Sequence, residues 1–192
     1  VGATIGTGSV TTDINDNDND LMALKLSGTS SVVEGGTASY DVKLDGVGLM
    51  VGQSVTMTLD SASGTATEVA DFAKLVAGGL VAGSGLSLSG VSTDAATGAV
   101  TFTVTNTGAS DLAAGATLAS VSLATVDDVL VEGPENFTVS LSSAAGVSGS
   151  PVTTTINDND VFPLIGDGLS HVFEGGLPGG IKGSPSDSAT DL

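Results

Sequence analysis

Residues 152–160 read VTTTINDND, a run of Val, Thr and Ile that ends in Asp and Asn, and eight of these nine letters stand 142 positions earlier as VTTDINDND at 10–18. A second pair of similar segments supports the repeat: VVEGG at 32–36 returns as VFEGG at 172–176. Repetition at a fixed period indicates a chain built from repeated units. The stretch therefore predicts a unit of about 140 residues in which a strand leads into an acidic end.

This period divides the chain into three parts. We expect residues 1–18 to be the tail of a preceding repeat with its linker, residues 19–160 to be one whole repeat, and residues 161–192 to be a linker and the opening of the next repeat. The chain starts at Val1 without an initiator Met. We interpret it as an excerpt of a longer array whose secretion signal lies elsewhere.

The composition favours an all-β domain with an aliphatic core. Aromatic residues make up 3% of the chain, Trp and Cys are absent, and there are 28 glycines. A net charge of −18, from 22 acidic residues against four lysines, argues against nucleic acid and anionic membranes as partners. The longest apolar stretch is short and broken by glycine, so we expect no membrane insertion. The natural counterpart of this charge is a cation.

Alternating polar and apolar residues predict half-buried strands with turns between them. Seven or more such strands indicate an antiparallel β-sandwich. No convincing helix is expected, and the best candidate, 66–75, has weak helical periodicity; strand placement in 77–116 stays open. The expected strands lie near 21–33, 39–45, 53–60, 100–105, 118–126, 137–142 and 152–157.

Simple up-and-down alternation of these strands brings the acid-bearing turns to one end. Two unit charges about 4 Å apart repel by about 4 kcal/mol at an effective dielectric constant near 20, so such a group needs a positive partner. Ca²⁺ takes 6–8 oxygen ligands, and eight carboxylates suffice for roughly two to four ions. Zinc lacks its usual Cys and His ligands. The predicted set is Glu34, Asp71, Asp127, Asp128, Glu132, Glu135, Asp158 and Asp160.

Four segments resemble Calx-beta domains, and together they span the repeat: VVEGGTASYDVKL (32–44), GTATEVADF (64–72), VDDVLVEGPENFTVSL (126–141) and TTTINDND (153–160). The resemblance implies an Ig-like sandwich that binds clustered Ca²⁺ at one end through the acidic residues just named. The sequence Asp158-Asn159-Asp160 stands where the family often has three aspartates. This departure lowers the local charge and leaves the number of ions open.

Other acidic residues have plainer interpretations. Isolated Asp residues in β-rich chains mostly cap turns, which is our expectation for Asp45, Asp60, Asp94 and Asp111. Asp16 and Asp18 belong to the acidic end of the preceding repeat and could bind calcium weakly or bridge the junction. An EF-hand over 16–27 is rejected, because Leu21 stands where glycine is needed and Ser27 where the bidentate Glu belongs.

Catalysis is not expected. A carboxylate pair could in principle cleave a glycoside, but the chain has one Tyr and no Trp to hold a sugar. His171 has no nucleophile in a triad-like context. The sequon at Asn136 is interpreted as a coincidence within a strand.

The leading hypothesis is a calcium-rigidified spacer in a large bacterial surface adhesin that is secreted by a type I system. Its expected partners are the adjacent repeats of the same chain, and any surface ligand is expected to bind elsewhere in the full protein. The Thr/Ser/Gly/Asp-rich composition and the segment 172–192 resemble those of such adhesins. Two alternatives stay open: a ligand- or glycan-binding module that uses 77–116, and a calcium-sensing regulatory domain of the kind found in sodium–calcium exchangers.

Overall fold

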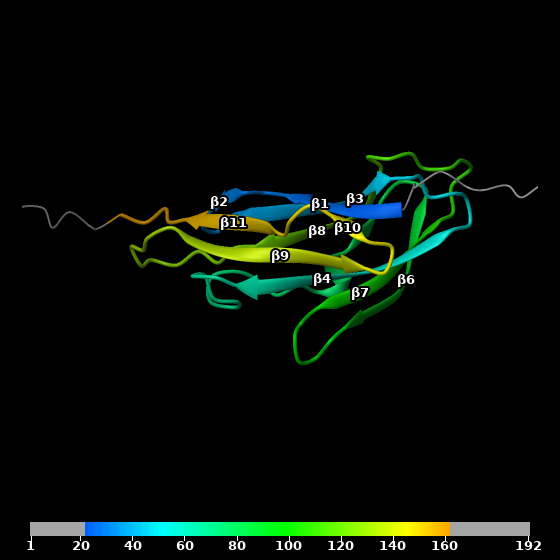
Figure 1. The fold of residues 1–192 in the computed structure, drawn as a ribbon. Coiled ribbons are helices and arrows are strands. Elements are labelled where there is room, and N and C mark those ends of the chain that lie inside the picture. Colours follow the sequence, from blue (N-terminus) through cyan, green and yellow to red (C-terminus); the bar gives the residue numbers. More distant parts are fainter. Residues whose placement is uncertain (1–21, 162–192) are drawn as a thin grey trace, which may run out of the picture. The chain divides into compact units, whose positions relative to one another are not determined.

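The computed structural model describes residues 22–161, and their internal contacts place a β-sandwich within the unit 1–159, with a second unit starting at residue 160. Figure 1 shows the strands of the sandwich. They are β1 (Met22–Gly28), β2 (Ser31–Val33), β3 (Thr37–Gly46), β4 (Ser54–Ser63), β5 (Val81–Ala82), β6 (Leu86–Thr93), β7 (Val100–Asn106), β8 (Thr117–Ala124), β9 (Glu135–Ser143), β10 (Val147–Ser148) and β11 (Val152–Asn157).

The strands form two sheets. The five-stranded sheet has the order β10-β1-β3-β8-β5, and the six-stranded sheet has the order β2-β11-β9-β4-β7-β6. Most neighbours are antiparallel, which confirms the predicted antiparallel sandwich. Two edge pairs, β1 with β10 and β2 with β11, are parallel.

The first predicted strand, near 21–33, is divided in the structure. β1 belongs to the five-stranded sheet, whereas β2 belongs to the six-stranded sheet. Gly28 packs so closely on the ring of Tyr40 that a Cβ there would collide with it. Beyond it, the Thr29 amide donates to the Ser39 carbonyl, while the Ser30 carbonyl accepts from the Thr155 amide. The chain therefore changes sheets between residues 28 and 31.

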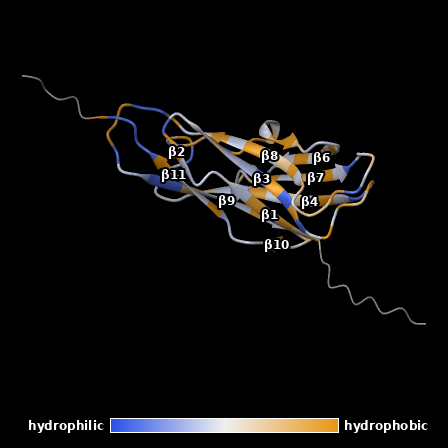
Figure 2. Ribbon diagram, turned by 90° about the horizontal axis from the view of Figure 1, so that it is seen from above, coloured by the Kyte–Doolittle hydropathy of each residue, from blue (hydrophilic) through white to orange (hydrophobic). Residues whose placement is uncertain are grey.

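The core lies between the inner faces of the sheets. β7 shows the pattern most clearly: Val100, Phe102 and Val104 are buried, while its threonines face outward and share hydrogen bonds with hydroxyl groups of β4. Alternation of this kind is what a half-buried strand requires. Figure 2 shows the apolar residues along the strands and the mixture of hydrophilic and hydrophobic residues in the loops beyond β2 and β11.

The segment 77–116 contains a 3-10 helix, η1 (Ala77–Gly79), and the strands β5, β6 and β7. β6 is an edge strand, and its pairing with β7 shifts register between Ser89 and Ser92. Within residues 22–161 there is no α-helix, and none of 66–75 is helical. A helix able to cross a bilayer was likewise not found in this range.

Candidate metal centre

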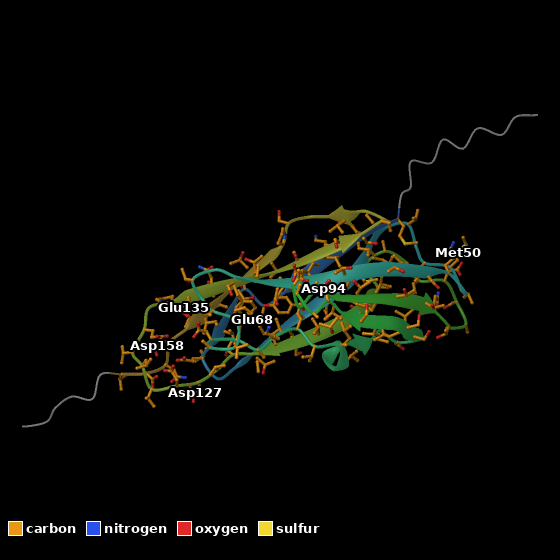
Figure 3. All side chains as sticks on the ribbon, turned by 90° about the horizontal axis from the view of Figure 1, so that it is seen from below. Met50, Glu68, Asp94, Asp127, Glu135 and Asp158 are labelled. Atoms are coloured by element: carbon orange, nitrogen blue, oxygen red, sulfur yellow. The ribbon has the colours of Figure 1, made fainter. Side chains whose placement is uncertain are left out.

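The acid-bearing loops lie at one end of the sandwich, as strand alternation predicts. β9 starts where β4 ends, with Phe137 opposite Ser63, and β11 ends where β9 starts, with Ile156 opposite Glu135. β8 ends where β3 starts, with Ala124 opposite Thr37. Figure 3 shows Glu135, Asp127 and Asp158 at this end and Met50 at the opposite end. We call it the acidic end.

Three carboxylates form the closest group at the acidic end. Asp71 comes from the loop after β4, Glu132 from the loop between β8 and β9, and Glu135 is the first residue of β9. One carboxylate oxygen of each lies within 4.8 Å of the other two. Such oxygens are close enough to be bridged by one cation, since Ca²⁺–oxygen distances are about 2.3–2.6 Å.

Two further carboxylates complete the surroundings of this group. Oxygens of Glu34 and Asp158 lie within 4.8 Å of one another. Both residues line a small cavity together with Asp71, Glu132 and Glu135. The cavity measures about 10 Å³, which is close to the room that a single water molecule needs. Its wall therefore offers carboxylate oxygens around a space of about the right size for one ion.

Local hydrogen bonds and packing hold Asp71 in place. Its Oδ2 accepts from the Thr67 amide at 2.6 Å, and its carbonyl accepts from the Val126 amide at 2.9 Å. The next residue, Phe72, is fully buried and stacks on Phe137 with ring centroids 4.2 Å apart. This ring pair joins the Asp71 loop to β9, two residues after Glu135.

The loops that carry the other carboxylates are also joined. Asp158 accepts from the Glu132 amide at 2.6 Å. The Asn159 side-chain amide donates to the Glu34 carbonyl at 3.2 Å and to Asp127 Oδ1 at 3.1 Å. Asn159, which sequence reasoning treated only as a departure from three aspartates, is thus a connecting residue. A donor between two acceptors is the signal that could have identified it.

Asp127 and Asp128 lie at the acidic end but do not line the cavity. Asp127 packs against the turn at Gly35, where a Cβ would lie 3.0 Å from the Asp127 Cβ. Asp128 Oδ1 accepts from the Leu130 amide at 2.7 Å, which closes a turn within its own loop. Of the eight predicted carboxylates, five therefore line the cavity, whereas Asp127 and Asp128 lie outside it.

The electrostatics of the group favour neutralisation. Burial raises the pKa of the Glu135 carboxyl, and the neighbouring charges of Asp71 and Glu132 raise it further. The lysine ion pairs of the described residues are Lys43 with Asp41 and Lys74 with Glu68. These two lysines are thus engaged by other carboxylates.

The oxygen-only donor set fits a hard cation such as Ca²⁺. The chain has no cysteine, and residues 22–161 contain no histidine, so the soft ligands that select zinc are missing from this part of the chain. Carboxylates on separate loops give a flexible shell, which suits Ca²⁺ better than the strict octahedron of Mg²⁺.

Four residues named in the sequence analysis do not belong to the described part of the first unit. Asp16, Asp18 and His171 fall outside the described residues, and Asp160 is the first residue of the second unit. Asp94 caps a turn as expected, since its Oδ1 accepts from the Ala96 and Thr97 amides.

The expectation for the other isolated aspartates is partly wrong. Asp60 lies within β4 opposite Ser140 instead of in a turn. Asp45 lies within β3, where it accepts from the Ser148 hydroxyl. Asp111 accepts from the Val51 amide and so joins two separate loops. The prediction fails for Asp45 and Asp60 because a single Asp within a strand resembles a turn residue in the sequence.

Comparisons with known proteins give a fold-level likeness only. No family model matches the chain, and no curated protein matches it. One similar solved structure is the sixth cohesin of Acetivibrio cellulolyticus scaffoldin B, in complex with a Cel5 dockerin mutant, at TM-score 0.43 and 10% identity over 71% of this chain and 97% of that one. Another is the Coh-OlpA–Doc918 cohesin–dockerin complex of Clostridium thermocellum, at TM-score 0.46 and 12% identity over 72% and 99%.

Proposed function

We propose that the sandwich binds calcium at its acidic end and acts as a spacer module in a tandem array on a bacterial surface. The observation that carries this proposal is the cavity lined by five carboxylates from four segments of the chain. Like charges held this close destabilise the fold unless a cation lies among them. Calcium would neutralise this repulsion and, by binding carboxylates from different loops, would cross-link them.

The repeat supplies the second part of the proposal. The motif at 152–160 ends at the acidic end, and its copy at 10–18 precedes β1 by three residues, 19–21. In an array, each acidic end would therefore adjoin the start of the next sandwich. Calcium bound there would stiffen the junction, and its removal would leave repelling carboxylates and a hinge. A secreted protein would then become rigid only in calcium-rich surroundings.

The Calx-beta resemblance supports the same function. The segments that carry it contribute all five cavity carboxylates. On those motifs we propose that the chain is a Calx-beta domain. The adhesin-like composition supports an extracellular location and type I secretion. The adhesion target would be bound by another part of the full protein.

Thermal melting of the 192-residue chain tests the calcium proposal. At a calcium concentration 100 times the Kd, binding stabilises the fold by about 2.7 kcal/mol, which corresponds to roughly 10 °C for a domain of this size. Magnesium at the same concentration is the matched control and should give a much smaller shift. A melting temperature that is the same in calcium and in chelator would refute the proposal.

A further inference from the structure

A second, larger cavity lies at the end opposite the carboxylates. Its volume is about 560 Å³, and Met50, which lines it, has 55% of its surface exposed. Figure 3 places Met50 at the end away from Asp158. We call this cavity the methionine cavity. It is lined by Met22, Val47, Gly48, Met50, Gln53 and Asp111.

The loops around the methionine cavity are firmly held. Leu49 and Leu112 exchange two backbone hydrogen bonds of 3.0 Å. The buried Asn106 side chain donates to the Leu49 carbonyl at 2.9 Å, and the Val51 amide donates to Asp111 at 2.8 Å. Hydrogen bonds between separate loops thus hold the wall of the cavity in place.

The acidic end carries apolar side chains that the fold leaves outside. Val129 is 86% exposed and Leu130 is 58% exposed. Both stand on the loop between β8 and β9, in a turn closed by the bond from the Leu130 amide to Asp128. We call these two residues the apolar tip. Two adjacent apolar side chains on one turn offer a small apolar surface to a partner.

The length of the linker brings these two features together in an array. Asp16 is the counterpart of Asp158 in the first motif; five residues separate it from Met22, and six steps of extended chain span at most about 22 Å. In an array, the acidic end of the preceding sandwich would therefore lie within about 22 Å of Met22. Met22 itself lines the methionine cavity.

We propose that the apolar tip of one sandwich seats in the methionine cavity of the next copy along the chain. The inference rests on the proposed tandem function and names the contact that would fix the junction. Val129 and Leu130 would pack on the side chains of Met22 and Met50, which are flexible and adapt to an apolar partner. Calcium would assist by neutralising the carboxylates that approach Asp111. Tethering raises the effective concentration of this weak contact.

Cysteine cross-linking of the 192-residue chain tests the proposal, because the chain has no cysteine of its own. Val131→Cys and Val51→Cys chains, which keep the apolar tip and both methionines, are mixed in calcium under mild oxidation at about 1 mM, near the effective concentration that a short tether gives. Val51 is 49% exposed. Disulfides need Cα atoms within about 7 Å, so docking should make this pair link at least tenfold faster than Val131→Cys with Val81→Cys. Val81 is 64% exposed on the edge strand β5 and serves as the control. Adding Leu130→Asn to the Val131→Cys chain should abolish the difference.

Equal rates for the two pairs in calcium would overturn the docking contact. The melting test on the same chains is read separately. Stabilisation by calcium without selective cross-linking leaves the proposed function standing and refutes the contact. Selective cross-linking without any calcium stabilisation retains the contact and refutes the calcium role.

Discussion

Replacing Glu135 by Gln should stabilise the calcium-free protein and remove most of its response to calcium. The Glu135 carboxylate lies within 4.8 Å of both Asp71 and Glu132. At that separation two charges repel by about 1 kcal/mol in water and by about 3.5 kcal/mol at a dielectric constant of 20. Glu132 is exposed, so the lower figure applies, and two relieved contacts amount to about 2 kcal/mol.

The same substitution removes a proposed calcium ligand. If affinity falls a hundredfold, calcium at 100 times the original Kd stabilises the variant by about 0.4 kcal/mol instead of about 2.7 kcal/mol. In melting experiments, Glu135→Gln should therefore unfold roughly 6–10 °C higher than wild type in chelator. The two proteins should converge when calcium is added.

Glu68→Gln is the matched control, because it removes one negative charge from the same end without removing a proposed calcium ligand. Glu68 stands in the same loop as Asp71, but its carboxylate is paired with Lys74 at 3.3 Å and accepts from the Ser61 hydroxyl. Glu68→Gln should leave the calcium increment at its wild-type value. The reasoning fails if Glu135→Gln is no more stable than wild type in chelator, or if it keeps the full increment.

Three further outcomes are expected. Phe72→Ala removes a fully buried ring from the stack on Phe137 and should cost about 3–5 kcal/mol in urea unfolding; a loss below about 1 kcal/mol would show that the stack is unimportant. Gly35→Ala places a Cβ at φ +72° and 3.0 Å from the Asp127 Cβ, and should lower the free energy of unfolding by about 1 kcal/mol or more. Gly52→Ala is the control, because its Cβ meets no neighbour at φ +80° and its cost therefore reports the backbone strain alone.

The third outcome concerns pH. The raised pKa of Glu135 means that the folded state binds its proton more tightly than the unfolded state, so calcium-free stability should fall as pH rises from the ordinary glutamate value through the raised one. Calcium should reverse this slope, because its ligands must be deprotonated; a calcium-free slope of the opposite sign would contradict the assignment.

The location of the acidic end could be predicted from the sequence, because the alternation of polar and apolar residues identifies the strands and successive strands run in opposite directions. Once β8, β9 and β11 are recognised as alternating runs, the ends at which Glu135 and Asp158 lie follow from up-and-down order. The change of sheet between β1 and β2 could not be predicted, since it depends on Gly28 packing against Tyr40, a contact between residues on different strands.

The composition of the cavity wall was also beyond the sequence. Asp127 and Asp128 are adjacent to the segment that supplies Glu132, yet their side chains are engaged by Asn159 and by the Leu130 amide. The conformation of each loop determines which carboxylates face the cavity, and no periodicity in the sequence reports it. The Phe72–Phe137 stack could not be predicted either, because the sequence of neither segment indicates which residue its ring contacts.

The parallel pairing of β2 with β11 determines how the sandwich would bear tension. Ser31, Val32 and Val33 lie opposite Thr155, Ile156 and Asn157 in the same direction. A pull that enters at Met22 and leaves beyond Asn157 would draw these two strands past each other along their length. Their hydrogen bonds would then be sheared together instead of opening one after another, so the force needed for rupture is shared across the whole pair.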